Sequence, residues 1–529
     1  MAEDGFINLR IVRFIQEGYG PVYNLTERVE AGTSPLWLFV LTVGDWLLPL
    51  RLEWVAVSFG VLLTVMGLLT ASRAGAMTAK SLGVDKPLPL GLYVYCSISV
   101  AWDFASGGLE NGLGLFYLGV CAYLLTRASN KSQGAKNPWR TALFIGLGPL
   151  VRPDFALFMV SFLAAMIVLS EKRWSTRFKL VSLALVIPVS YQVFRMAFFG
   201  IIVPNTALTK SAAGARWSRG LTYLHNFTIP YLLLPVLGVI ICLVIFKIVQ
   251  PAFKNPNLKK HLLVWSALPA TGLVHGIYVI RLGGDFMHGR MLLPALFSMS
   301  VPVVVSRKAS FTTIGILIWC SISFSFLRSN NDFGANIWHT EVYDERLYYV
   351  NKSQNPHPVT LIDYENISLG WVKHGEKLKK YSAFDKLLIT QELSEVEVSY
   401  KDVSPGVKPG VYAATDNIGL TGYAAGIDVH VLDTLGLAHP LVSRIEVSKS
   451  KEGRPGHDKE SREWVWAQVV PKLATPDMVK LLNCPSIIEL KEAISAPLTL
   501  DRLVSNFTGS LARTRLTLPS KPTPESVCP

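Results

Sequence analysis

The chain has 529 residues, of which 50% are hydrophobic and only 17% are charged, and its mean hydropathy is +0.34. This composition excludes a wholly soluble or disordered protein and indicates a polytopic membrane protein with room for a soluble domain. The net charge of +13 does not indicate nucleic-acid binding, because many Lys and Arg residues lie in short loops between apolar segments, where they set membrane orientation.

The N-terminal segment is polar and carries two adjacent carboxylates, Glu3 and Asp4. Residues 36–50 follow as an apolar stretch that Asp45 and Pro49 interrupt. Because a membrane span needs about 20 apolar residues, this stretch predicts an interfacial or re-entrant helix. No signal peptide precedes it, so an N-terminus outside the cytoplasm leads us to expect a further membrane helix ahead of Met1.

About ten apolar segments follow that are candidates for membrane spans. They lie at about 52–72, 88–104, 109–127, 139–151, 154–171, 180–199, 229–249, 262–281, 290–306 and 311–327, and 139–151 is the shortest.

The connecting loops fall into two alternating sets. Basic loops near 73–86, 127–140, 172–179, 247–260 and 307–308 are predicted to be cytoplasmic. The other set comprises the N-terminal stretch, 103–110, 152–154, 200–228 and 282–290. These segments are predicted to be external, and the C-terminus with them.

Residues 328–529 mix polar and apolar residues and contain no run long enough to span a membrane. They predict a soluble domain of α/β or β-rich type, in which residues 399–437 form strands with glycine-bearing turns. The six cysteines form no CxxC pair, and this spacing argues against a zinc site or a redox motif. A disulfide between Cys484 and Cys528 is expected if this domain lies outside the cytoplasm.

Charged residues gather in the loops predicted to share the side of Glu3 and Asp4. Taken singly, each has a structural interpretation, as a snorkelling helix end, a turn former or a local ion pair. Together they predict a site for a lipid-linked phosphate, because guanidinium groups match phosphate geometry. A transporter would instead need polar groups near the bilayer midplane. The residues of this set are Glu110, Arg152, Asp154, Asn205, Lys210, Arg281, Asp285, His288 and Arg290.

Several segments carry a resemblance to polytopic GT-C glycosyltransferases that use polyprenyl-phosphate sugars. They are AEDGFINLR, GPVYNLTERVEAGTSPLW, SGGLENG, VRPD, FFGIIVPNTALTK, GGDFMHGRMLLP, ATDNIGLTGYAAGIDVHVLDTLGLAHPL and GRPGHDK. The chain most closely resembles the terminal β-(1→2)-arabinofuranosyltransferases of mycobacterial and corynebacterial cell-wall arabinan. The resemblance implies a GT-C transmembrane catalytic domain at 1–327, with 1–51 as its first external loop, and an extracytoplasmic domain at 328–529.

The resemblance also implies the substrates and the site. The donor would be decaprenyl-phosphoryl-D-arabinofuranose, and the acceptor the arabinan ends of arabinogalactan and lipoarabinomannan. Asp4 matches the catalytic carboxylate of the first external loop, beside Glu3, and would act as general base. The charged set above would bind the donor phosphate and sugar. Asp416, Asn417, Tyr423 and Asp428, with Asp433 nearby, resemble a carbohydrate surface for the acceptor.

Alternatives stay open at this point. If a β-phosphoryl donor gives a β product, configuration is retained, and Asp4 or Glu3 would then serve as nucleophile, unless attack is same-face. A divalent cation at the carboxylate pair fits its oxygen ligands without being required. A second enzyme hypothesis keeps the fold and changes the sugar to mannose or amino-arabinose. A non-enzymatic hypothesis makes the chain a transporter or an envelope protein linked to motility.

Overall fold

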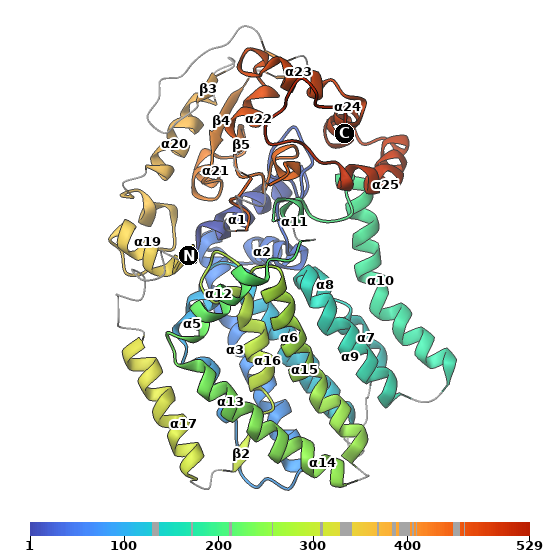
Figure 1. The fold of residues 1–529 in the computed structure, drawn as a ribbon, viewed down its shortest axis with the longest axis vertical. Helices are drawn as coiled ribbons and strands as arrows, with labels where there is room; N and C mark the ends of the chain where they lie inside the picture. Colours follow the sequence, from blue (N-terminus) through green and yellow to red (C-terminus); the bar gives the residue numbers. More distant parts are fainter. Residues whose placement is uncertain are drawn as a thin grey trace.

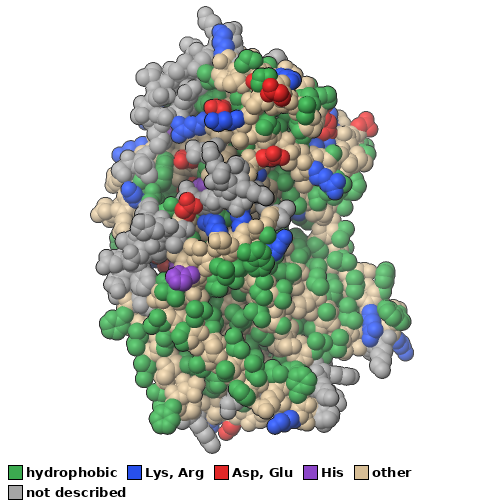
Figure 2. Space-filling view, in the orientation of Figure 1, with side chains coloured by type: hydrophobic (Ala, Val, Ile, Leu, Met, Phe, Trp, Pro, Cys, Tyr) green, Lys and Arg blue, Asp and Glu red, His purple; other side chains and the backbone are tan. Residues whose placement is uncertain are grey.

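Long apolar helices form one end of the molecule, and shorter helices with a small sheet form the other, with α1 (Glu3–Gln16) and α2 (Pro35–Leu47) between them (Figure 1). The space-filling view has a broad band of hydrophobic side chains over the helical end (Figure 2). This computed structural model describes residues 1–129, 137–170, 173–210, 214–255, 258–306, 310–327, 341–367, 370–382, 388–390, 403–404, 407–408, 410–447, 455–459 and 461–529. Parts of the basic loops and of segment 399–437 lie outside these ranges.

Four helices within the described ranges are long and apolar enough to cross a membrane. They are α3 (Leu52–Ser81), α6 (Asn111–Ser129), α10 (Trp174–Phe199) and most of α15 (Lys259–Arg281). A fifth span results if α12 (Trp217–Thr228) and α13 (Leu233–Val244), which meet at 90°, are counted together. The chain is therefore a membrane protein by helix length and composition, and α2 confirms the short helix predicted near 36–50.

Other predicted spans are shorter or interrupted in the structure, so the count of ten is not confirmed. The segment 88–104 divides into α4 (Leu90–Cys96) and α5 (Ser99–Ala105), because Ile98 adopts an extended conformation between them. The segment 290–306 holds only the eight-residue helix α16 (Leu293–Ser300). Pro302 lacks an amide donor for a continuing helix, and the chain proceeds into strand β2 (Val305–Ser306).

The remaining elements of residues 1–327 are short. They are β1 (Pro87–Leu88), antiparallel to β2, α7 (Pro138–Ile145), α8 (Gly148–Val151), η1 (Pro153–Phe155), α9 (Ala156–Leu169), α11 (Asn205–Thr209), the π-helix η2 (Ile245–Val249), α14 (Gln250–Lys254), η4 (Arg290–Leu292), α17 (Phe311–Ile322) and the π-helix η5 (Ser323–Leu327).

Glycines set the distance between α3 and α6, the central pair of the bundle. A Cβ at Gly112 would lie 2.2 Å from the carbonyl oxygen of Gly60, and one at Gly119 would lie 2.3 Å from that of Gly67. Small residues allow membrane helices to approach with their backbones in contact. This contact fixes the N-terminal end of α6, and with it the preceding residue Glu110.

Residues 341–529 combine short helices with a three-stranded parallel sheet of order β3-β4-β5. Its described elements are α19 (Glu345–Ser353), η7 (Leu361–Tyr364), α20 (Trp371–Tyr381), β3 (Leu388–Thr390), β4 (Val411–Thr415), α21 (Leu420–Ala425), β5 (Val429–Asp433), η8 (Val442–Arg444), α22 (Arg462–Ala467), η10 (Pro471–Leu473), α23 (Pro476–Leu482), α24 (Pro485–Ser495) and α25 (Leu500–Arg515). In the register, Val411 pairs with Val429 and Thr415 with Asp433.

Segment 411–433 is a β-α-β unit, so strands joined only by turns were the wrong interpretation there. All five residues of β4 are buried, which is typical of a parallel strand covered on both faces. The helices outnumber the strands in this region, so the β-rich alternative does not fit its described part.

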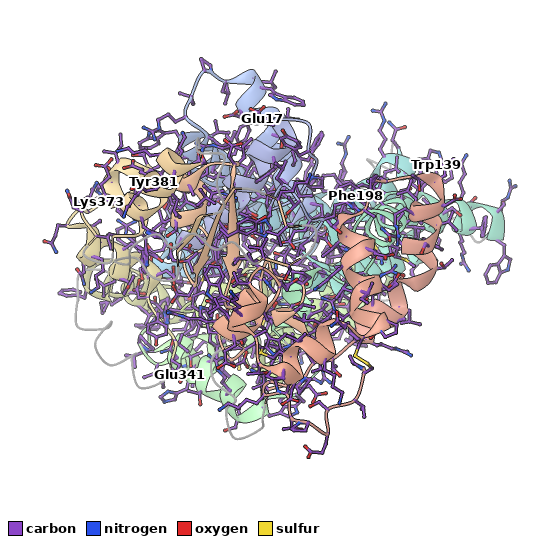
Figure 3. The ribbon with its side chains drawn as sticks, turned by 90° about the horizontal axis from the view of Figure 1, so that it is seen from above. Glu17, Trp139, Phe198, Glu341, Lys373 and Tyr381 are labelled. Atoms are coloured by element: carbon purple, nitrogen blue, oxygen red, sulfur yellow. A yellow bond between two sulfur atoms is a disulfide. The ribbon has the colours of Figure 1, made fainter. Side chains whose placement is uncertain are left out.

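A disulfide joins Cys484 to Cys528, with the two Cα atoms 5.5 Å apart. It ties the start of α24 to the end of the chain and confirms the pairing expected from the sequence. In the view from above, Phe198 at the end of α10 lies beside the C-terminal helices (Figure 3). The C-terminal region therefore rests on the top of α10 as well as on α1.

The N-terminal helix α1 is held by the C-terminal region through Arg10, whose side chain is buried. Its guanidinium donates to the carbonyl oxygens of Gly422, Gly426 and Val429, the last at 2.8 Å. It also donates to the carbonyl of Tyr23 at 3.0 Å. Helix α1 thus packs with residues 420–429 as one unit, although more than 400 positions separate Arg10 from these partners.

Candidate active site

Helix α1 places the two N-terminal carboxylates at the boundary between bundle and C-terminal region. Glu3 and Asp4 occupy its first turn, where the helix dipole favours negative charge. Phe6 anchors the helix, with its ring centroid 5.5 Å from that of Tyr364 and 5.6 Å from that of Tyr423.

Glu3 faces the C-terminal region. Its carboxylate accepts hydrogen bonds from the backbone N–H groups of Gly419 and Leu420, the second at 3.2 Å. Burial and the nearby charge of Asp4 raise the pKa of Glu3 well above its ordinary value. These contacts give Glu3 a structural role, the docking of α21 onto α1.

Asp4 faces a cluster of opposite charge centred on Arg290. One guanidinium nitrogen of Arg290 lies 3.7 Å from Asp4 Oδ2 and 3.7 Å from Asp285 Oδ2, and another lies 3.2 Å from Glu110 Oε1. Burial lowers the pKa of Arg290, but the three carboxylates around its guanidinium outweigh this effect and raise the pKa above its ordinary value. The structure thus brings together residues from α1, the loop before α6 and the loop after α15.

Two further cations complete the cluster. Lys210 lies 3.7 Å from Asp285, and Lys210 and Arg290 lower the pKa of that carboxyl despite its burial. Arg152 lies 3.8 Å from Glu110 and contacts both carboxylate oxygens of Asp154, at 3.0 and 3.1 Å. Arg152 and Asp154 therefore form a layer behind Glu110.

Asp4 is the most accessible carboxylate in this cluster. Its side chain is 22% exposed, against 4% for Glu110 and 2% for Asp285. Burial, together with the charges of Asp285 and Glu110, raises the pKa of Asp4 although Arg290 and Lys210 oppose the shift. A raised pKa suits a group that takes a proton at near-neutral pH.

Two cavities meet at Asp4, one of about 60 Å³ and the other of about 310 Å³. Both are lined by Asp4, Phe286, Leu437 and His457. The smaller cavity adds the charged groups Glu110, Lys210 and Arg290. The larger adds Glu3, Tyr343, Glu345, Tyr348, Tyr349, Trp371, Asp416, Asn417, Ile418 and Leu435.

The C-terminal region closes these cavities through residues 455–459. His457 lies against Phe286, with ring centroids 4.6 Å apart. Asp458 pairs with Arg216 at 2.8 Å, and the Lys459 ammonium donates to the carbonyl of Leu208 at 2.7 Å. This segment is therefore fastened to the loops that follow α10.

Asn205 has a structural position rather than a place in a cavity. Its amide donates to the carbonyls of Gly436 and Leu437 at 2.8 and 3.0 Å and accepts from the hydroxyl of Ser443 at 2.9 Å. Asn205 thus fixes the loop that contributes Leu437 to both cavities. Within that loop the buried Asp433 accepts from the N–H groups of Leu435 and Ala438.

Four other predicted site residues lie apart from Asp4. His288 lines a third cavity of about 240 Å³, and its ring nitrogens contact Asn226 at 2.7 Å and Tyr231 at 3.2 Å. Arg281 ends α15, and its carbonyl accepts from the Arg216 N–H at 2.7 Å. Arg281, Tyr423 and Asp428 line none of these three cavities.

Tyr423 and Asp428 do not fit the predicted acceptor surface. The ring of Tyr423 is buried, with the Arg13 guanidinium 3.7 Å from its centroid. Asp428 is exposed beyond α21. Asp416 and Asn417 do line the larger cavity, because they follow directly from the carboxyl end of β4.

Sequence reasoning missed Glu345, Tyr343, Tyr348 and Trp371, which all line the larger cavity. They follow the last apolar segment without a spacing that marks them. His457 belongs to GRPGHDK, a segment singled out by resemblance without a role. No group of three metal-ligating side chains gathers in the described part of the chain; Asp4, Glu110 and Asp285 face Arg290 instead.

The sequence of the chain is similar to those of known proteins. Residues 407–527 match the model of the AftB family C-terminal domain. A terminal β-(1→2)-arabinofuranosyltransferase of Mycobacterium tuberculosis is 33% identical over 593 aligned positions, which cover 100% of this chain and 93% of the relative. A protein of the same name from Corynebacterium glutamicum is 31% identical, with 100% and 84% covered. No solved structure matches the chain.

Proposed function

Because the chain belongs to the AftB family of terminal β-(1→2)-arabinofuranosyltransferases, we propose that it transfers D-arabinofuranose to the ends of arabinan chains. It is a membrane glycosyltransferase that uses a lipid-linked sugar donor. The donor is decaprenyl-phosphoryl-arabinofuranose, and the acceptors are the arabinan ends of arabinogalactan and lipoarabinomannan. The observation that carries the proposal is the contact between Asp4 and Arg290 where two cavities meet.

The proposed donor phosphate lies in the small cationic cavity. Lys210 is 34% exposed and lines this cavity together with Arg290. A phosphate that binds there would contact these two cations and replace some of their present contacts with carboxylates. Such electrostatic stabilisation of a leaving group contributes several kcal/mol per well-placed donor.

The proposed acceptor sugar occupies the larger cavity on the other side of Asp4. Asp416 and Asn417 line it with Trp371 and His457, a mixture of hydrogen-bonding and aromatic side chains that suits a sugar. Asp4 takes the proton of the attacking acceptor hydroxyl. The oxygen of that hydroxyl bonds to C1 of arabinose as the bond from C1 to the phosphate breaks. Positioned proton transfer of this kind contributes roughly 10²–10⁴ in rate.

We place the site on the extracytoplasmic side of the plasma membrane. Residues 1–327 form the catalytic membrane domain and 328–529 the extracytoplasmic domain. The disulfide between Cys484 and Cys528 supports this side, because disulfides persist in oxidising compartments. A polymeric cell-wall acceptor would also reach the larger cavity from there.

The test is the variant Asp4→Asn in the full chain, assayed with radiolabelled lipid-linked arabinofuranose and a short arabinan acceptor. Transfer should fall by about 10²–10⁴-fold, while Asp501→Asn, on the exposed first turn of α25, should keep wild-type transfer. Unchanged transfer by Asp4→Asn would remove this residue from the mechanism.

Assays that supply each lipid-linked sugar separately identify the sugar that the protein transfers. Transfer of mannose or amino-arabinose in place of arabinofuranose would overturn the assigned substrate and leave the fold assignment in place. Intact-mass measurement during turnover tests a nucleophilic role for Asp4, since an arabinosyl adduct on wild-type protein would replace the role of base by that of nucleophile.

A further inference from the structure

Glu345 is a half-buried residue with one buried carboxyl oxygen, and the proposed mechanism leaves it without a role. It is the first residue of α19 and follows Asp344, whose side chain accepts from the Leu347 N–H at 2.9 Å and caps the helix. Glu345 and Tyr349, one helical turn apart, line both the 240 Å³ cavity and the 310 Å³ cavity. Glu345 therefore stands where these two spaces meet.

The two cavities differ in chemistry. The 240 Å³ cavity is bordered by Trp54, Val57, Val100 and Phe104, and Trp54 is 46% exposed on the membrane-spanning helix α3. The 310 Å³ cavity is bordered by Asp4 and by polar residues of the C-terminal region. Glu345 does not line the 60 Å³ cavity assigned to the donor phosphate, but it shares the 310 Å³ cavity with Asp4, which borders both. The bridging oxygen of the phosphate would therefore face Glu345 beside Asp4, where the 60 Å³ and 310 Å³ cavities meet.

The surroundings of Glu345 favour its protonated form. Its Oε2 atom is buried and has no hydrogen-bond partner among the described residues. Burial, with the charges of Asp4 and Asp285, raises the pKa of Glu345 to about 8, and Arg290 opposes the shift. The titratable and charged groups around it are Met1 (amine), Glu3, Asp4, Asp103, Asp285, His288, Arg290, Asp344, Arg346, Tyr343, Tyr348, Tyr349, His357, Asp416 and His457.

We propose that Glu345 is the general acid of the transfer, an inference that rests on the proposed function. As the bond between C1 and the phosphate oxygen breaks, its electron pair stays on that oxygen, which receives the Glu345 proton. The acceptor oxygen bonds to C1 and loses its proton to Asp4. Return of that proton from Asp4 to the Glu345 carboxylate restores both groups, so the net change is one proton lost by the acceptor and one gained by the lipid phosphate.

The charge pattern of the cluster explains why an acid would help. Arg290 already faces three carboxylates, and Lys210 faces Asp285. Because these cations already pair with carboxylates before a phosphate binds, they neutralise the charge of the leaving group only in part. A neutral carboxyl group donates a proton without adding negative charge beside the phosphate.

The experiment compares Glu345→Gln with wild type and with Glu341→Gln in the full chain. Glu341 is exposed and is labelled in Figure 3, so its variant should keep wild-type rates. Glu345→Gln should lower kcat by about 10²–10⁴-fold with little change in the acceptor KM. The fall of wild-type kcat as pH rises through about 8 should disappear in the variant.

A donor with a more acidic leaving group separates acid catalysis from a structural role. Replacing the polyprenyl phosphate by an aryl phosphate should restore most of the kcat of Glu345→Gln but little of that of Asp4→Asn, because a weakly basic leaving group needs no proton. Equal losses with both donors, or wild-type kcat in Glu345→Gln, would overturn the proposal.

A second readout does not depend on turnover. The infrared C=O band of a protonated carboxyl group should be present in wild type at pH 7 and reduced in Glu345→Gln but not in Glu341→Gln. If wild-type protein transfers no arabinofuranose but this band behaves as expected, the proposed function fails while the protonated Glu345 stands. Absence of the band would overturn the acid role.

Discussion

Arg290 offers the sharpest test of the charged cluster, because its guanidinium faces Asp4, Glu110 and Asp285 in two directions. We predict that Arg290→Gln destabilises the protein and abolishes transfer, and that Arg290→Lys does both to a smaller degree. A lysine ammonium is a single point charge and cannot reproduce contacts made through two separate nitrogens.

The distances give the magnitude. With an effective dielectric constant of about 20, unit charges 3.2 Å apart interact by roughly 5 kcal/mol. Desolvation offsets most of this attraction, but removing one partner of a buried pair costs about 3–5 kcal/mol. We therefore expect Arg290→Gln to lose about 3–5 kcal/mol, and Arg290→Lys about 1.5–3 kcal/mol, the contribution of a charged hydrogen bond.

The assay is thermal unfolding of the detergent-solubilised full chain, followed by transfer assays at a temperature where each variant is folded. Arg281→Gln is the matched control, since Arg281 lies at the end of α15 and outside the three cavities described above. If Arg290→Gln melted with wild type, the three carboxylates would not depend on Arg290 and the reasoning would be refuted.

Three further predictions follow from other contacts. Gly419→Ala should lower both transfer and melting temperature, because its Cβ would lie 2.2 Å from the backbone oxygen of Glu3. Gly315→Ala, with open space around it in helix α17, should leave transfer unchanged and should not lower the melting temperature. Reducing the disulfide, which closes a loop of 44 residues, should cost about 4 kcal/mol by the chain-entropy relation, and an unchanged unfolding curve in reductant would contradict this. Burial raises the pKa of Glu345 to about 8 and that of Glu27 to about 7. Between pH 5 and 8 the folded protein therefore keeps protons that the unfolded chain has lost, so the free energy of unfolding should fall as pH rises from about 5 to 8. This fall should be smaller in Glu345→Gln.

The sequence predicted those features that depend on short stretches of chain. Continuous apolar runs located α3, α6, α10 and α15, because nearly every residue of a span meets the same apolar surroundings. The alternation of basic loops with loops of a different character predicted that Asp4, Glu110 and Arg290 share one side, and Arg290 does contact both carboxylates.

What the sequence left open depends on contacts between distant segments. An apolar run does not reveal that Ile98 breaks a helix or that α16 ends after eight residues. Asn205 and Tyr423 have the residue types of a binding surface, yet their partners make them structural. Glu345 carries no local signal, since only the folded chain brings it between two cavities.

The bond between Glu3 and Gly419 joins residues 416 positions apart, and this bears on biosynthesis. Chains are made from the N-terminus at about 5–20 residues per second. The segment around Gly419 is therefore synthesised some tens of seconds after α1. Until residues 410–447 and 455–459 have been made and have folded, the cavities around Asp4 are incomplete. Nascent or truncated chains that already sit in the bilayer should therefore consume no lipid-linked sugar.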